Sequence, residues 1–380
     1  MLVSAARTPL GAFCGKLEGL SEQQLGAAAM REAIRRAEIE PAMIDEVIVG
    51  LAKQTSRPSN GGRHAMLLAR LPENIPAYTV QRQSASGLQA VVNGFWAIRC
   101  GDAAMILAGG MESMSQIPFE VRNARYDFTG KGREISDAIP AQEAGAQPEE
   151  RYGILTMAQV AENFIRKYRF SERELEAFAG GSLQKALSAE DKGLFREEIF
   201  PVAVKKGKKE ESIDRDELQK KAPLLAPPAD GAAMCLLASR EKTTALGLPA
   251  LAEIVSVGIA AVDPRYAGMA VAEAGLKALR QSGLTLQEIE VIELNEMSAA
   301  ECLAIFREWQ VRGGARDTLA ERVNPSGGAL SMGNPWGAAG AVLLTKVIYG
   351  LRRKGGRIGM AAVTAEGGQG MAMIVRNDSC

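Results

Sequence analysis

Apolar and polar positions alternate between helix-like and strand-like patterns from the start of the chain. Apolar residues recur at helical spacing over 23–36, and a short β-branched run at 47–50 ends in glycine. The range 88–98 again has a helical period, and the apolar run 103–108 before two glycines is typical of a buried strand. Repeated alternation of this kind predicts an α/β fold, with a mostly parallel sheet covered by helices.

The same order of elements returns in the last third of the chain. A helix followed by a strand occurs twice, and the second copy is displaced by about 245 residues with a one-residue slip. A further helix and strand then follow, as they do in the first part. The repeated helix–strand pair is 29–35 with 46–48 in the first copy and 274–280 with 290–292 in the second. The further helix and strand are 337–350 and 357–362. This order predicts two similar halves.

The stretches between the two copies have a different character. Residues 116–153 combine glycine, proline and mixed charge with few strand signals, which predicts a long excursion from the core. Residues 205–221 are dense in charge, typical of a solvated surface, with polyphosphate binding as the alternative. A proline-rich connector (222–228) is expected to be extended before a strand at 231–234.

Composition narrows the possible classes of protein. A chain of 380 residues can bury a core large enough for two packed halves. Its 45 basic side chains balance 45 acidic ones, so nothing points to a nucleic-acid partner. The longest apolar runs are far shorter than the roughly 20 residues that span a bilayer, and no signal peptide precedes the first strand. We therefore expect no membrane partner and a cytoplasmic location.

Cysteine and histidine usage argues against a metal centre. The cysteines are dispersed without C-x-x-C spacing, which is unlike a disulfide framework or a zinc site. They are Cys14, Cys100, Cys235, Cys302 and Cys380. His64 is the single histidine of the chain, so any site that needs two imidazoles is excluded. We expect reduced thiols and no metal.

Three glycine-rich segments are candidates for a site. In 80–89, small polar residues come directly before a helix, which places Ser84 near unpaired N–H groups that stabilise an anion or an acyl oxygen. The alternative is that Ser84 caps the helix. The segment 324–337 indicates either close approach to a ligand or close packing of the halves. The segment 364–370 lacks the lysine and the glycine spacing of nucleotide-binding loops.

Motifs in these segments and elsewhere resemble those of the thiolase family, in the same order along nearly the whole chain. They are the opening strand and turn (3–9), the nucleophile loop (84–90), the strand and turn after it (108–115), and the segments similar to N-E-A-F-A (295–299), G-H-P (333–335) and the end of C-x-G-G-G-x-G (367–370). The resemblance implies the thiolase fold, with two similar βαβαβαββ halves in a five-layered αβαβα arrangement plus a loop domain. We place the halves at 1–245 and 246–380, with the loop domain at about 116–200 of the first half.

The positions that carry thiolase chemistry hold other residues here. Thiolases use a cysteine as the acyl-accepting nucleophile, a histidine to activate it, and a second cysteine as acid and base. The resemblance places Ser84, Asn334 and Thr364 at these positions, and His64 matches none of them. A serine needs an adjacent base, and losing general-base help costs about 100- to 10,000-fold in rate. We therefore predict neither ordinary thiolysis nor Claisen condensation.

Other positions of the resembling motifs are changed or retained. Glu366 replaces a glycine whose N–H contributes to an oxyanion hole, where a carboxylate repels developing negative charge. The stretch 218–234 lacks the G-T-V-T-A-G-N-A-S segment that helps hold the pantetheine arm of coenzyme A. Asn295, which holds the water of the first oxyanion hole in the family, is retained. The stretch 157–163 resembles M-G-x-T-A-E-N beside the substrate, so Met157 is a candidate ligand-binding residue.

Two functions follow as hypotheses. The first is a thiolase-like protein of the acyl-CoA C-acyltransferase family that acts as a noncatalytic partner of an active enzyme or binds an acyl-CoA-like ligand. The alternative is a repurposed carbon–carbon bond enzyme, either aldolase-like or a serine-dependent acyltransferase, that uses Ser84, Asn295 and Glu366. In the alternative, burial beside Ser84 raises the pKa of Glu366 and makes it a general base.

The resemblance also sets expectations for ligands and partners. No cofactor is required, and coenzyme A or an acyl-CoA is the expected substrate or ligand. The chain is expected to form a homodimer or homotetramer, or a hetero-oligomer with an active thiolase. A tunnel open to Ser84 favours the enzyme, whereas a tunnel filled by Trp336, Met297 or Met332 favours the noncatalytic role.

Overall fold

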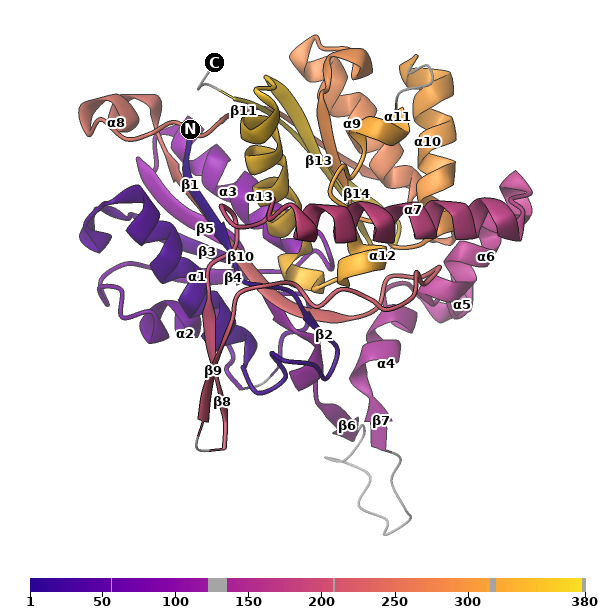
Figure 1. The fold of residues 1–380 in the computed structure, drawn as a ribbon. Helices are drawn as coiled ribbons and strands as arrows, with labels where there is room; N and C mark the ends of the chain where they lie inside the picture. Colours follow the sequence, from indigo (N-terminus) through magenta and orange to yellow (C-terminus); the bar gives the residue numbers. More distant parts are fainter. Residues whose placement is uncertain (56, 122–134, 208, 315–318, 378–380) are drawn as a thin grey trace.

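Two β-sheets lie beside each other in this computed structural model, with helices between them and on both outer sides (Figure 1). The structure describes residues 1–55, 57–121, 135–207, 209–314 and 319–377. Cys380 and part of the predicted excursion, residues 122–134, therefore lie outside the described residues. Among the residues that the structure describes, none of the helices combines the length and the apolar character needed to span a bilayer.

The first sheet has the strand order β1-β10-β5-β3-β4, with the short β2 paired to β10. Its strands are β1 (Leu2–Arg7), β2 (Gly11–Ala12), β3 (Glu46–Gly50), β4 (Ala77–Val80), β5 (Met105–Ser113) and β10 (Ala229–Ala238). Strand β3 is parallel to both β4 and β5, whereas β10 is antiparallel to β5 and β1. The predicted parallel sheet is thus mixed, because β1 and β10 enter it without crossover helices.

The second sheet repeats this order as β11-β14-β13-β12. Its strands are β11 (Glu253–Ala261), β12 (Val291–Leu294), β13 (Ile358–Ala365) and β14 (Gln369–Arg376). Here β12 and β13 are parallel, and β14 is antiparallel to β13 and β11. Strands β11, β14, β13 and β12 correspond in order and direction to β1, β10, β5 and β3, which confirms the two similar halves.

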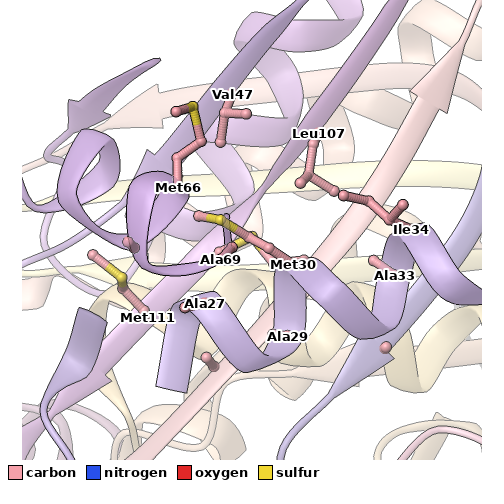
Figure 2. Close-up of a cluster of buried hydrophobic side chains, with 14 of the residues drawn as sticks. Ala27, Ala29, Met30, Ala33, Ile34, Val47, Met66, Ala69, Leu107 and Met111 are labelled. Carbon is pink, nitrogen blue, oxygen red and sulfur yellow. The ribbon is translucent and has the colours of Figure 1, made fainter. Parts of the chain in front are cut away.

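One outer layer consists of α1 (Glu22–Ala37) and α2 (Gly61–Leu68). Ser21 caps α1 by accepting a hydrogen bond from the N–H of Gln24, whose side chain in turn accepts from Ser21 N. Figure 2 shows the apolar face of α1, which includes Met30 and Ile34, against side chains of α2 and the first sheet. This burial, rather than helix propensity, is what holds the layer in place.

The middle layer consists of α3 (Ser86–Cys100) and α13 (Trp336–Lys354), which pack between the two sheets. The other outer layer contains α9 (Met269–Ser282) and α10 (Ala299–Gly313). Together with the sheets these layers give the predicted five-layered αβαβα arrangement. The N-terminal ends of α3 and α13 lie close together, since a Cβ added to Gly87 would be 2.8 Å from Gly337 O.

Strand β5 extends further than its pattern predicts. The sequence predicts its end at residue 108, before Gly109 and Gly110, but the strand continues to Ser113. A Cβ on Gly109 would lie 2.1 Å from Ala233 O, and one on Gly110 would lie 2.1 Å from Gly337 O. The two glycines therefore mark close packing of β10 and α13 against the strand, and not a turn.

The loop domain extends from the first half. It contains β6 (Phe119–Val121), β7 (Ile135–Asp137), α4 (Ala138–Ala144), α5 (Glu149–Tyr152), α6 (Met157–Tyr168) and α7 (Glu172–Asp191). Its long helices α6 and α7 pack against α10 through a cluster of apolar side chains that includes Phe164 and Ala300. This contact joins the loop domain to the second half.

The charge-dense stretch forms a hairpin of β8 (Val202–Lys206) and β9 (Lys209–Ile213), which extends away from the sheets (Figure 1). Most of its described charged side chains are exposed, as predicted for a solvated surface. The remaining helices are α8 (Arg240–Ala245), α11 (Leu319–Arg322) and α12 (Ala329–Met332). The proline-rich connector leads from this region into β10.

Candidate functional site

Ser84 lies in the tight turn between β4 and α3 and is fully buried. Gln83 has φ +47°, in the left-handed region, so the chain reverses directly before Ser84. Helix α3 begins at Ser86 with Ala85 as its N-cap residue, and no side chain caps it. Ser86 Oγ instead accepts from Arg82 N at 2.8 Å. Ser84 is therefore not the helix cap, and its hydroxyl is available for another contact.

That contact is with Glu366, on the turn between β13 and β14. Ser84 Oγ donates to Glu366 Oε1 at 3.4 Å. Gly367 and Gly368, with φ of +78° and +79°, form the turn. Burial and the nearby charge of Glu143 raise the pKa of Glu366 to about 7, although the N–H groups of Glu366 and Ser84 oppose that rise. The sequence-based expectation of a raised pKa is thus met.

The Glu366 side chain is only partly satisfied by hydrogen bonds. Its residue as a whole is partly exposed, but Oε2 is shielded from solvent and has no hydrogen-bond partner among the described residues. A buried carboxylate oxygen without a donor is costly in its charged form. Both protonation states of this carboxyl group are therefore populated near neutral pH.

Thr364 precedes Glu366 by two residues on β13 and contacts a second carboxyl group. Its Oγ1 donates to Glu301 Oε1 at 2.6 Å. Glu301 lies in the first turn of α10 and is buried. Burial raises the pKa of Glu301 to about 7, with a further contribution from the charge of Glu366 and an opposing one from Thr364. The site thus holds the buried carboxyl group of Glu301, and the charge of Glu366 raises its pKa.

The two asparagines of the site converge on a methionine. Asn295 follows β12, and Asn334 lies between α12 and α13. Asn295 Nδ2 and Asn334 Nδ2 each lie 3.3 Å from Met297 Sδ. A thioether sulfur is a weak acceptor, so its hydrogen bonds with the two amide donors are weak. Asn334 Oδ1 is buried and accepts no hydrogen bond within the described part of the chain.

The proline-rich connector packs against both of these segments. Ala226 N donates to Met297 O at 3.0 Å, and Asn334 N donates to Pro227 O at 2.8 Å. Ala229 N then donates to Asn334 O at 3.3 Å. The connector therefore passes directly over the Met297 and Asn334 segments and fixes their backbones.

Of the three apolar residues whose presence in a tunnel would favour the noncatalytic role, Met297 contacts the site amides. Trp336 is buried in a cluster with Ala52 and Met114. Met332 belongs to another core cluster, which includes Leu10. Trp336 and Met332 are thus part of the packing around α13.

The loop domain reaches the site through Glu143 on α4. Glu143 Oε2 accepts from Met157 N, the first residue of α6, at 3.3 Å. Burial raises the pKa of Glu143, and its charge in turn raises the pKa of Glu366. Met157 is partly buried and is connected to Glu366 through this carboxylate.

The other candidates for chemistry lie away from this cluster. His64 is exposed on α2, in the outer layer of the first half. Among the described residues, no group of three or more histidine, cysteine, aspartate or glutamate side chains is placed to hold a metal ion. The site thus offers two hydroxyls, two side-chain amides and neighbouring carboxyl groups.

Sequence reasoning missed Glu301 and Glu143 as parts of this site. Glu301 stands two residues beyond the motif at 295–299, and an acidic residue in the first turn of a helix is usually a solvated partner of the helix dipole. Its burial follows from the contact between α10 and β13, which joins residues 63 positions apart. The local pattern carries no signal for either contact.

Comparison with known proteins gives one consistent result. The family model for the thiolase N-terminal domain matches residues 1–241, and that for the thiolase C-terminal domain matches residues 248–377. An acetyl-CoA acetyltransferase of Pseudomonas aeruginosa is 36% identical over 403 residues, covering 100% of this chain and 99% of that protein. A β-ketoadipyl-CoA thiolase of the same species is 36% identical over 398 residues, covering 98% of each.

Solved structures agree with these relatives. The acetyl-CoA acetyltransferase of Bacillus anthracis superposes with a TM-score of 0.92 at 30% identity, covering 99% of this chain and 98% of that one. Human mitochondrial 3-ketoacyl-CoA thiolase also gives a TM-score of 0.92 at 30% identity, covering 100% and 98%. The names of these relatives all refer to coenzyme A thioesters.

Proposed function

Because the chain belongs to the thiolase family, we propose that it is a member that performs neither ordinary thiolysis nor Claisen condensation. In its place we propose a noncatalytic role, as a partner of an active enzyme or as a binder of an acyl-CoA-like ligand. The observation that carries this proposal is the contact of Met297 Sδ with the amides of both Asn295 and Asn334. The nucleophile position and the connector give it further support.

Catalysis of acyl transfer depends on donors that point at the developing oxyanion. Removing one such donor typically costs about 100- to 1,000-fold in rate. Here the two side-chain amides of the site both point at a neutral thioether that belongs to the chain itself. This arrangement supports a pocket that is not organised for an oxyanion beside Asn295.

The nucleophile position supports the same proposal. Among the described residues, Ser84 has no imidazole partner, and its hydroxyl makes one long hydrogen bond, of 3.4 Å, with Glu366. Thr364, at the position of the second acid and base, donates a hydrogen bond to Glu301. A threonine hydroxyl does not titrate near neutral pH, so it cannot replace a thiol in that role.

The connector bears on ligand binding. It occupies the stretch from which the pantetheine-holding segment of the resembling family is missing, and it is tied by backbone hydrogen bonds to Met297 and Asn334. A shortened connector in this place weakens or alters the binding of coenzyme A. Both a partner role and a ligand-binding role are compatible with the proposed loss of thiolysis and Claisen condensation.

The test is turnover of acetoacetyl-CoA with coenzyme A by the purified protein, beside an active thiolase as a positive control. We expect no turnover at ordinary thiolase rates. Intact-mass spectrometry after incubation with acyl-CoAs measures binding and acylation of Ser84 together, with Ser84→Ala as the matched control. Turnover at thiolase rates that Ser84→Ala abolishes would refute the proposal.

A second candidate is a repurposed carbon–carbon bond enzyme, and the Ser84–Glu366 pair favours it. A carboxyl group with a pKa of about 7 is suited to act as a general base at neutral pH. In a retro-aldol cleavage, Glu366 would take the proton of the 3-hydroxyl as the C2–C3 bond breaks. A carbonyl then forms at C3, and C2 takes a proton to give the shortened thioester.

This candidate has its own readout. Incubation with 3-hydroxyacyl-CoAs, in the absence of free coenzyme A, would release an aldehyde or ketone and a shorter acyl-CoA. Glu366→Gln keeps the shape of the side chain but removes the base, so it should abolish that release. Products that persist in Glu366→Gln would exclude Glu366 as the base.

We also propose the remaining organisation from the resemblance. The halves would divide at 245 and 246, and the exposed edge of the first sheet at β4 would pair across a two-fold axis in a homodimer or homotetramer. The alternative assembly is a hetero-oligomer with an active thiolase, and a cytoplasmic location completes the proposal. Light scattering of the chain alone, and mixed with an active family member, tests the assembly.

A further inference from the structure

The carboxylate of Glu366 lies beside the hydrogen-bond donors around Ser84. Ser84 Oγ donates to Oε1, and the backbone N–H groups of Ser84 and of Glu366 itself also interact favourably with the carboxylate. These donors come from two parts of the chain separated by 282 positions. They meet because the β13–β14 turn lies against the start of α3.

The fold makes this an attractive position for negative charge. Ser84 comes just before the first turn of α3, a helix of 15 residues whose first N–H groups have no intrahelical partner. The helix dipole adds partial positive charge at the same end. An acyl oxygen that develops negative charge would bind to the same N–H groups.

The backbone of the turn fixes where Glu366 begins. A Cβ on Gly368 would lie 2.4 Å from Val262 O, and one on Gly367 would lie 2.9 Å from Ala146 O. Both glycines also have positive φ. The turn is therefore held closely by its surroundings, and the side chain of Glu366 is its adjustable part.

We propose that the Glu366 carboxylate is a built-in occupant of the oxyanion site formed by the N–H groups of Ser84 and Glu366, so that an acyl carbonyl oxygen enters only when this side chain moves away. The inference rests on the proposed function, since it gives a second reason why the chain does not accept acyl groups readily. It makes Glu366 the residue that decides which ligands reach Ser84.

The contacts of Glu366 allow such a movement. Oε2 has no hydrogen-bond partner within the described ranges, and the bond of Oε1 to Ser84 is long. Glu143 adds repulsion from the loop domain. The side chain is partly exposed. A ligand that brings its own acceptor to the two N–H groups therefore displaces few strong interactions.

The test uses a Ser84→Cys background, which supplies a nucleophile whose acylation can be followed. The variants are S84C, S84C/E366G, S84C/E366A and S84C/E366Q. The probe is the acetyl thioester of N-acetylcysteamine, a small thioester that needs no nucleotide-binding surface. The sulfur of residue 84 attacks the thioester carbonyl, the bond to the cysteamine sulfur breaks, and the thiol proton leaves with that sulfur. Intact-mass spectrometry measures the rate of acetylation.

A second probe separates occupancy from charge. Alkylation by iodoacetamide also requires the thiolate of residue 84, but its transition state develops no oxyanion at a carbonyl. Removing a neighbouring carboxylate raises the thiolate fraction and accelerates both reactions equally. The ratio of acetylation to alkylation therefore cancels the effect on the thiolate and reports what Glu366 does at the oxyanion site.

We expect this ratio to be at least about tenfold higher in S84C/E366G and S84C/E366A than in S84C, because a freed pair of donors is worth that much or more. S84C/E366Q loses the charge but keeps the size and an acceptor of the side chain, so its ratio should lie well below those of the two truncated variants. An equal ratio in S84C and both truncated variants would overturn the inference. Circular dichroism checks that each variant folds. If the additional glycine of S84C/E366G loosens the turn, S84C/E366A still provides the test.

The outcome is distinguishable from that of the proposed function. The proposed function fails if the unaltered chain, with Ser84 in place, turns over acetoacetyl-CoA. The inference fails if the probe ratio is insensitive to truncation of Glu366. Either result can occur without the other, since the first measures natural turnover and the second compares engineered thiols.

Discussion

Thr364 Oγ1 donates a 2.6 Å hydrogen bond to Glu301 Oε1, which joins the end of β13 to the first turn of α10. The threonine hydroxyl does not titrate near neutral pH, whereas burial raises the pKa of Glu301 to about 7. The consequence is a protein whose stability depends on the charge state of its site.

Glu301→Gln should stabilise the protein at high pH. Burial raises the pKa of Glu301 from 4.5 to about 7, so the folded state binds its proton more tightly than the unfolded state. The favourable contribution of that proton is complete below about pH 4.5 and is lost as pH rises through 7. A shift of this size corresponds to on the order of 3 kcal/mol. Glutamine keeps an acceptor for Thr364 and has no charge.

The measurement is the free energy of unfolding in denaturant at pH 5 and pH 8, for the unaltered chain and for Glu301→Gln. The difference between them should grow toward pH 8 in favour of the variant. Glu32→Gln, at a partly buried position of α1, is a control without this trend, because the neighbouring arginines lower the pKa of Glu32. A constant difference between the two pH values would contradict a buried, titrating Glu301.

Thr364→Val tests the same hydrogen bond from the other side. Valine keeps the shape of the side chain but leaves the Glu301 carboxyl group without this donor. We expect a loss of about 1–3 kcal/mol of stability, and a further rise in the pKa of Glu301, since the Thr364 bond lowers it. Carboxyl carbon NMR of labelled glutamate follows that pKa. An unchanged titration would mean that the bond contributes nothing to the charged state.

Much of the fold and of the site could be predicted from patterns along the chain. The helix at 23–36 and the strand at 47–50 are α1 and β3, displaced by one residue at most at their ends. Both signals are local, because a periodic apolar face reports burial directly. Motif order also predicts that Ser84, Asn334 and Thr364 belong to one site.

The remaining features of the site depend on contacts between distant segments. Ser84 meets Glu366 across 282 positions, and no local pattern specifies that distance. Met297 could be predicted to fill space, but its position between Asn295 and Asn334 follows from the path of the connector. Side-chain contacts of this kind arise from packing between layers, which a single sequence does not display.

Met297→Leu tests whether the thioether satisfies the two asparagines. Leucine has a similar volume and accepts no hydrogen bond, so the amides of Asn295 and Asn334 lose their acceptor. We expect a loss of about 1 kcal/mol, and less in an Asn334→Ala background, which removes one of the two donors. A double-mutant cycle in denaturant gives the coupling between positions 297 and 334. Met332→Leu, in a purely apolar cluster, is the volume control. No coupling would show that the sulfur contacts carry no stability.

Arg7→Met should destabilise the protein more than Glu301→Gln, Thr364→Val or Met297→Leu. Arg7 is fully buried on β1 and forms ion pairs of 2.8 Å with Glu198 and 2.7 Å with Asp216. Its removal takes this cation from both buried carboxylates, although Glu198 keeps a second ion pair with Arg353 at 3.3 Å. Breaking such a buried pair costs about 3–5 kcal/mol, because the desolvated charge that remains has no compensation. The measurement is the denaturant midpoint at neutral pH.

The pair of Arg35 with the partly buried Glu32 on α1 provides the matched control. The Arg35 side chain is 72% exposed, so Arg35→Met should cost less than about 1 kcal/mol. If both substitutions had the same small effect, the ion pairs of Arg7 would not hold the β1 strand against the segment after α7. The opening motif at 3–9 would then owe its place in the fold to apolar packing alone.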